Sequence, residues 1–168
     1  AGGSVSGNTT VCSGTNSGLV TLSGHTGNIV RWQSSTTNGT SWSNISNTTA
    51  TLVYANLNTT TWYRAEVLLA PSPPNVSAFS TPAIITVDAA SSGTINTSVA
   101  VCSGSNSGSL SLTGTFTNVA GWDSSTNGGL NWIPIANTTT TKNYSNLTTT
   151  TMYRASVING TCPATYAT

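Results

Sequence analysis

The chain has 168 residues, of which four are basic, three are acidic and 36% are hydrophobic. A charged fraction of 4%, against about 25% in ordinary globular proteins, leaves no basic surface for nucleic acid or anionic lipid. No apolar run approaches the roughly eighteen residues of a membrane-spanning helix, so direct membrane insertion is not expected. Abundant Thr, Ser, Asn and Gly, together with five Trp and five Tyr, predict a soluble, folded β protein with a neutral surface, which favours an extracellular location.

The sequence repeats itself at an offset of 90 residues. Without a gap, 31 of the 65 positions from Ser4 to Leu68 match their counterparts. The repeat predicts two copies of one domain, at residues 1–89 and 93–168, joined by a short linker.

Within each copy, apolar and polar residues alternate with a period of two. In the first copy this pattern predicts strands near 3–6, 9–12, 18–23, 28–34, 41–46, 51–55, 61–69 and 77–87, with equivalents 90 residues later. No helix is predicted. Short strands bounded by Gly, Asn and Ser turns predict an all-β chain of two tandem immunoglobulin-like, or fibronectin III-like, antiparallel β-sandwiches. The second copy is expected to lack its last strand, because the sequence stops where that strand begins.

Two aromatic residues in each copy are expected in the core: Trp32 and Tyr63 in the first, and Trp122 and Tyr153 in the second. Leu precedes each of these tyrosines by six residues. This spacing resembles the tyrosine corner of immunoglobulin-like sandwiches, in which the hydroxyl ties a loop to the backbone.

The strand that carries Tyr63 also predicts a possible contact face. Its opposite side carries Trp62 and Arg64, and the second copy has Met152 and Arg154 there. Two alternatives remain open for Trp62. It forms a contact between modules or chains, or it makes a cation–π pair with Arg31 or Arg64.

Four repeated strings carry a family resemblance: Val-Cys-Ser-Gly at 11–14 and 101–104, Trp-x-x-Ser at 32–35 and 122–125, Gly-x-x-Trp at 39–42 and 129–132, and Thr-x-Tyr-Arg-Ala at 61–65 and 151–155. They resemble the immunoglobulin-like repeats of very large secreted surface proteins of gliding and related Bacteroidota. The resemblance implies a cell-surface or released multi-repeat protein of the adhesin or gliding-associated type, exported by the type IX route.

Three cysteines allow one disulfide and one remaining thiol. We expect Cys102 to pair with Cys162, which follows a predicted hairpin tip. Cys12 is then left as a buried free thiol or as the site of an intermolecular bridge.

The strongest candidates for chemistry are His25, Glu66, Asp88 and Asp123, and His25, Glu66 and Asp123 do not recur at an offset of 90 residues. No pair of acids or metal-binding spacing is repeated, so we expect no enzyme, no cofactor and no metal site.

Three functions remain open. The first is a structural or adhesive module, the stalk or spacer of a long adhesin, whose partners are neighbouring repeats, copies of itself, glycans or other surfaces. The second is a subunit of a self-assembling filament completed by strand donation. The third and weakest is a carbohydrate-binding module, for which Trp62 is the main candidate platform.

Overall fold

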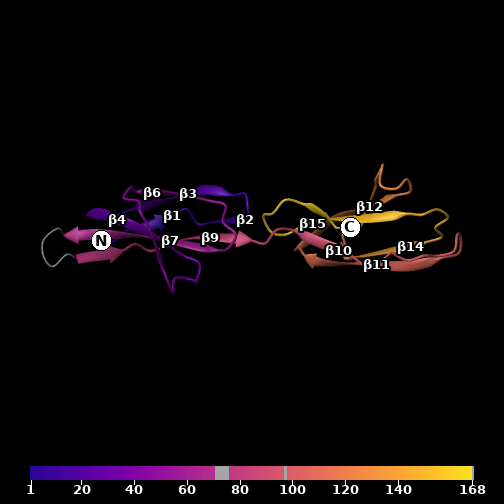
Figure 1. Cartoon of the computed structure of the whole chain (residues 1–168), viewed down its shortest axis with the longest axis horizontal. Coiled ribbons are helices and arrows are strands. Elements are labelled where there is room, and N and C mark those ends of the chain that lie inside the picture. Colours follow the sequence, from indigo (N-terminus) through magenta and orange to yellow (C-terminus); the bar gives the residue numbers. More distant parts are fainter. Residues whose placement is uncertain (71–75, 97, 168) are drawn as a thin grey trace. The chain divides into compact units, whose positions relative to one another are not determined.

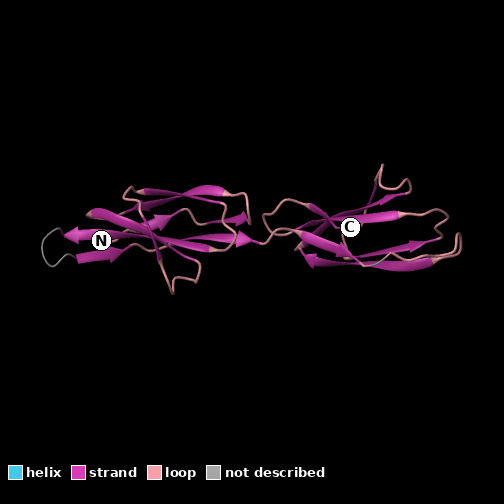
Figure 2. Ribbon diagram, in the orientation of Figure 1, coloured by secondary structure: helices cyan, strands magenta, loops and turns pink. Residues whose placement is uncertain are grey.

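The computed structural model describes residues 1–70, 76–96 and 98–167. The chain divides into two compact units, Ala1–Asp88 (unit 1) and Ala89–Thr168 (unit 2). Every regular element in the described ranges is a β-strand, as Figure 2 shows. Those ranges contain no helix that could cross a membrane. The predicted all-β class is confirmed.

Unit 1 consists of two sheets, most of whose strands are labelled in Figure 1. The smaller sheet has the order β1-β3-β6 and the larger has the order β2-β9-β7-β4-β5, with β8 also pairing with β7. This arrangement of two sheets is that of an immunoglobulin-like sandwich. The strands are β1 Ser4–Ser6, β2 Thr9–Cys12, β3 Ser17–Ser23, β4 Asn28–Ser35, β5 Ser43–Ile45, β6 Thr51–Ala55, β7 Thr61–Ala70, β8 Val76–Phe79 and β9 Ala83–Asp88.

The single strand expected over 77–87 is divided into β8 and β9, which pair with different parts of β7. Residues 66–70 of β7 pair with β8, and residues 61–63 pair with β9. Between the two strands, the Ser80 amide donates to the Ala65 carbonyl, and the Ser80 hydroxyl accepts from the Ala65 amide. Pro82 follows, and because proline has no N–H it cannot continue the ladder.

Unit 2 repeats much of this plan, with sheets of order β10-β11-β14 and β13-β12-β15-β16. Strand β16 is the counterpart of β8, since it pairs with the same part of the neighbouring strand. The strand expected at 99–102 is not formed. Its counterpart β2 pairs in parallel with β9, and the described part of unit 2 contains no strand equivalent to β9. The strands are β10 Ser92–Ile95, β11 Ser107–Thr115, β12 Asn118–Ser125, β13 Ile133–Ile135, β14 Thr141–Ser145, β15 Met152–Ile158 and β16 Thr165–Ala167.

Each unit has its own apolar core around one tryptophan. Trp32 and Trp122 are 0% and 1% exposed. Each indole N–H donates to a carbonyl oxygen at 2.9 Å, that of Thr49 in unit 1 and that of Thr139 in unit 2. Along β7, Tyr63, Ala65 and Val67 are buried, as the alternation predicts. Tyr153, the counterpart of Tyr63, is only half-buried. The surroundings of Tyr153 in unit 2 therefore differ from those of Tyr63 in unit 1.

Candidate functional site

The outward face of β7 carries an arginine enclosed between two aromatic rings. The guanidinium carbon of Arg64 lies 3.9 Å from the ring centroid of Trp42 and 3.8 Å from that of Phe79. A guanidinium is planar and weakly hydrated, so stacking on both faces suits it better than it would suit a lysine. In the described part of unit 1, Arg64 stacks on Trp42 and Phe79 rather than on Trp62, and the predicted contact of Trp62 between modules or chains stays a prediction.

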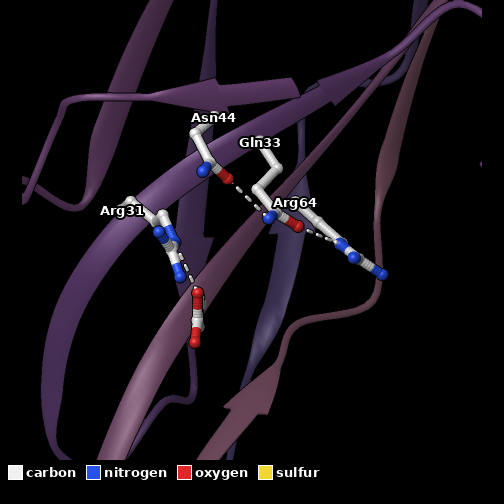
Figure 3. Close-up of polar contacts among 5 residues, drawn as sticks. Arg31, Gln33, Asn44 and Arg64 are labelled. Atoms are coloured by element: carbon white, nitrogen blue, oxygen red, sulfur yellow. Dashed lines mark hydrogen bonds and ion pairs between the residues drawn. The ribbon is translucent and has the colours of Figure 1, made fainter. Parts of the chain in front are cut away.

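Polar contacts extend this cluster across three neighbouring strands (Figure 3). Arg64 Nε donates to Gln33 Oε1 at 2.8 Å, and Gln33 Nε2 donates to Asn44 Oδ1 at 2.8 Å. Beside them, Arg31 Nε forms an ion pair with Glu66 Oε2 at 2.6 Å. The network joins β5, β4 and β7 edge to edge, so this face is held rigid by its own side chains.

Unit 2 builds the same cluster with different partners. The guanidinium carbon of Arg154 lies 4.2 Å from the ring centroid of Trp132 and 3.9 Å from that of Tyr166. Its Nε pairs with Asp123 Oδ2 at 2.8 Å. Asp123 stands where unit 1 has Gln33. The arginine at this position therefore donates to a neutral amide in unit 1 and to a carboxylate in unit 2.

The repeated sequence strings explain how these tryptophans are positioned. The hydroxyl of Ser35, which ends Trp-x-x-Ser, accepts from the Gly39 amide at 3.0 Å and closes the loop after β4. Gly39 has a φ of 77°, a conformation that glycine adopts readily. Its carbonyl accepts the Trp42 indole N–H at 2.9 Å. The strings therefore build the loop that lays Trp42 against Arg64.

The remaining predicted contact residues do not form an open aromatic platform. All five tryptophans lie in the described residues, and none is exposed. Trp62 is half-buried close to Gly39 and Trp42. Met152 is 46% exposed. None of the tryptophans thus offers the flat exposed surface on which a sugar ring would stack. Among the described residues, the exposed aromatic side chains are Phe79 and Tyr166, at 46% and 56%.

The ion pair of Glu66 makes unit 1 sensitive to acid. The hydrogen bond from Arg31 lowers the pKa of Glu66 below its ordinary value of 4.5, although burial opposes this shift. A carboxylate with a lowered folded-state pKa stabilises the fold above the unfolded-state value, and this contribution is lost as the pH falls through the folded-state pKa.

We therefore expect Glu66→Gln to lower the free energy of unfolding of unit 1 at pH 7 by about 1 kcal/mol, since Arg31 is partly exposed to solvent. The gap between wild type and variant should shrink as the pH falls below about 4.5 and approaches zero at lower pH. Urea denaturation at pH 7 and at pH 3 measures both gaps. Equal gaps at the two pH values would contradict this role of the ionised carboxylate.

An asparagine holds the loop that the tyrosine corner was expected to hold. Asn16 Nδ2 donates to the carbonyl oxygens of Cys12 and Leu57, both at 2.8 Å, and Asn16 Oδ1 accepts from the Leu57 amide at 2.9 Å. Among the described contacts, the Tyr63 hydroxyl makes no hydrogen bond to this loop. Burial raises the pKa of Tyr63, and the neighbouring Tyr54 adds to the shift. The prediction that the Tyr63 hydroxyl ties this loop to the backbone is therefore corrected: Asn16 makes these hydrogen bonds.

Unit 2 repeats the asparagine contacts. Asn106 donates to the carbonyl oxygens of Cys102 and Leu147, both at 2.7 Å, and accepts from the Leu147 amide at 2.9 Å. The repetition of Asn16 at position 106 was visible in the sequence. Because asparagine is common in turns throughout the chain, this repetition alone does not single out Asn16 and Asn106.

The cysteines differ from their predicted states. Cys12 takes part in a disulfide, and so does Cys162, whereas Cys102 is free and exposed. The predicted Cys102–Cys162 bridge and the predicted free Cys12 are therefore wrong. Cys102 lies in the segment that forms no strand, so it is not held against the sheet as Cys12 is in β2. Cys162 is 4% exposed in the loop after β15, where its amide donates to the Asn159 carbonyl.

Thiol labelling tests this assignment. A maleimide added to the non-reduced chain should attach once, at Cys102, because exposed free thiols react and disulfide sulfurs do not. Cys102→Ser should abolish the labelling, and after reduction and unfolding the wild-type chain should take up three labels, one for each cysteine in its sequence. Labelling of Cys12 or Cys162 before reduction would contradict the assignment.

The predicted candidates for chemistry are scattered. No group of three or more His, Cys, Asp or Glu side chains that could hold a metal occurs in the residues that the structure describes. Glu66 and Asp123 are engaged by arginines of their own units. His25 lies half-buried in the turn after β3, and its Nδ1 is buried without a hydrogen-bond partner. The structure does not bring these four side chains into one site.

The chain is similar to several solved structures. A marsupial T cell receptor is similar over 98% of this chain and 70% of its own, with 13% identity and a TM-score of 0.58. The N-terminal four Ig domains of Dscam1 isoform 6.9 match 98% of this chain and 44% of theirs, with 11% identity and a TM-score of 0.40. Fibronectin(III)-like modules of Clostridium thermocellum CbhA match 97% of this chain and 91% of theirs, with 9% identity and a TM-score of 0.37.

The likeness to the T cell receptor supports the immunoglobulin-like fold. No curated protein sequence matches the chain. A domain family described as a domain of unknown function, DUF8696, matches residues 1–89 and again residues 91–168. Because these matches span nearly the whole sequence, the chain belongs to the DUF8696 family.

Proposed function

We propose that the chain is a structural and adhesive module of a long extracellular protein, in which it serves as stalk or spacer. The observation that carries this proposal is the duplicated arginine cluster on the outer face of each sandwich. In both units an arginine is stacked between two aromatic rings, so the repeated side chains stabilise a sheet. A duplicated sandwich with rigid faces and a neutral surface suits a load-bearing array.

The finer proposal is a repeat of a Bacteroidota cell-surface or gliding-associated adhesin that is exported by the type IX route and has no enzymatic activity. The four repeated sequence strings support it, since they carry the family resemblance. A disulfide supports an oxidising, extracellular compartment. Adhesion would then arise from many weak contacts along a long array, whose avidity exceeds that of a single contact.

Mechanical unfolding of single molecules tests the stalk function. In the presence of reductant, a chain held between two inert handles should extend with two separate force peaks, one for each sandwich, because antiparallel ladders break cooperatively. Trp32→Ala should weaken or abolish one peak and leave the other unchanged. Extension without force peaks would overturn the stalk function.

A second candidate function is a subunit of an extracellular filament completed by strand donation. It is favoured by one observation: Val99 and Val101 of unit 2 are 58% and 42% exposed, an apolar surface that an added strand would cover. Light scattering and negative-stain microscopy, each with and without reductant, test it. Filaments that persist in reductant would support it, and a monomer of 17.1 kDa at all concentrations would exclude it.

A further inference from the structure

The two arginine clusters differ in the group that the arginine Nε contacts. In unit 2, Arg154 Nε pairs with the Asp123 carboxylate at 2.8 Å, so the positive charge of this guanidinium is compensated. In unit 1, Arg64 Nε donates to the neutral amide oxygen of Gln33 at 2.8 Å. The stacking geometry is repeated, but the guanidinium of unit 1 has no carboxylate on its Nε.

The acid that follows Arg64 on the outer face of β7 is already engaged. Glu66 Oε2 accepts from Arg31 Nε at 2.6 Å. Among the described residues of β4, β5, β7 and β8, these three side chains are the only charged ones. Two arginines therefore share one acid, and the outer face of these strands carries one uncompensated positive charge, that of Arg64.

The Arg64 guanidinium keeps one edge for a ligand. The rings of Trp42 and Phe79 stack on it, and Gln33 accepts its Nε–H. Its other N–H donors are on Nη1 and Nη2, which point away from the other side chains drawn in Figure 3. A carboxylate binds a guanidinium in the plane of the group, through two parallel hydrogen bonds. The edge formed by Nη1 and Nη2 is suited to this contact.

Neutral groups lie near this edge. Asn44 is exposed, and its Oδ1 accepts from Gln33, so its amide N–H₂ remains a donor. Phe79 is 46% exposed, which leaves part of its ring open beside the guanidinium. An amide and an apolar ring can contact the hydroxyls and the C–H groups of a sugar. The face therefore suits a ligand that has one carboxylate among several hydroxyls.

An acidic sugar fits this face better than an acidic peptide does. The carboxylate of a uronic acid is fixed to a rigid ring, so its binding orders few rotatable bonds, whereas a peptide must order both a flexible side chain and its backbone. A peptide with several acids would also meet a single uncompensated charge, and the Glu66 carboxylate would repel its further acids.

We propose that the free edge of Arg64 binds the carboxylate of an acidic sugar, a uronate unit of a polysaccharide, whose ring lies against Phe79 and whose hydroxyls contact Asn44. The inference rests on the proposed adhesive function, for which it names the class of ligand. The cluster of unit 2 does not bind this ligand, because Asp123 compensates the charge of Arg154. The contact acts at short range, since the whole chain has a net charge of only +1.

The probe is a trimer of galacturonic acid, added to the whole chain and followed by NMR. Binding should shift the Arg64 Nε–H and Trp42 indole N–H signals to saturation, and it should leave the Trp132 indole signal of unit 2 unchanged. The methyl ester of the same trimer keeps the ring hydroxyls and loses the charge. It should bind at least tenfold more weakly, because charge-assisted hydrogen bonds are the stronger ones.

Two reciprocal substitutions test the role of the charge. Gln33→Asp gives unit 1 the carboxylate that unit 2 carries at the same place, so it should keep the fold and weaken binding at least tenfold. Asp123→Gln should add a second binding event, seen as a shift of the Trp132 indole signal. Val53→Asp is the control, since it adds the same charge at a 70% exposed position of the other sheet of unit 1. Circular dichroism checks that all three variants keep their strands.

Several results would overturn the acidic-sugar site. These are no binding, equal binding of the trimer and its ester, equal losses for Gln33→Asp and Val53→Asp, or no second event in Asp123→Gln. A capped Gly-Asp-Gly peptide that binds as tightly as the trimer would assign the edge to acidic peptides and also overturn the proposal. None of these results would alter the two force peaks expected of a stalk, so the two proposals fail separately.

Discussion

Replacing Trp32 with alanine should unfold unit 1 at much lower urea concentrations, with a loss of about 3–5 kcal/mol in its free energy of unfolding. The indole is fully buried between the two sheets, and its N–H donates to the Thr49 carbonyl. Truncation leaves a cavity that close-packed strands cannot fill, and it leaves that carbonyl without its partner.

The measurement is urea denaturation followed by circular dichroism and by hydrogen exchange resolved for each unit. Trp122→Ala should have the same effect on unit 2, and either variant should leave the amides of the other unit protected. Trp62→Ala is the matched control, because its side chain is only half-buried and should cost less than half as much. Similar losses for Trp32→Ala and Trp62→Ala would contradict the placement of the core.

Asn16→Ala should destabilise unit 1 by about 2–4 kcal/mol, because one side chain makes three hydrogen bonds at about 1 kcal/mol each. The variant leaves the carbonyls of Cys12 and Leu57 and the amide of Leu57 without these partners. Asn16→Asp should be no more stable than Asn16→Ala, since a carboxylate keeps the acceptor but places negative charge against two carbonyl oxygens.

Chemical denaturation of the Asn16 variants should be compared with that of Asn58→Ala. Asn58 is exposed and accepts one hydrogen bond from Ser13, so its loss should change stability by less than about 0.5 kcal/mol. Asn106→Ala should reproduce the larger loss in unit 2. If Asn16→Ala costs no more than Asn58→Ala, the asparagine does not hold this loop.

The strands and the core were predictable because they depend on short-range patterns. A period of two along 61–67 places Tyr63, Ala65 and Val67 on one face, and these three residues are buried. The division between β8 and β9 was also readable in principle from Pro82, since proline interrupts a ladder.

The arginine cluster was not predictable in full, because its second aromatic residue lies at a different spacing in each copy. Phe79 follows Arg64 by 15 residues, whereas Tyr166 follows Arg154 by 12 residues. A comparison at a fixed offset of 90 therefore does not align Phe79 with Tyr166. The bonding state of the cysteines could not be predicted from the sequence either, since disulfide bonding depends on which sulfurs approach one another in space.

Because most charged side chains pair within their own units, they have little effect on the rate at which the protein associates with a partner. Arg31 with Glu66 and Arg154 with Asp123 form ion pairs within their own units, and the whole chain has a net charge of only +1. Little long-range field remains to draw a partner inward, so association should proceed at the unsteered rate of about 10⁵–10⁶ M⁻¹s⁻¹. It should also change little with ionic strength. A contact made by this protein would therefore form at a similar rate in fresh water and in sea water.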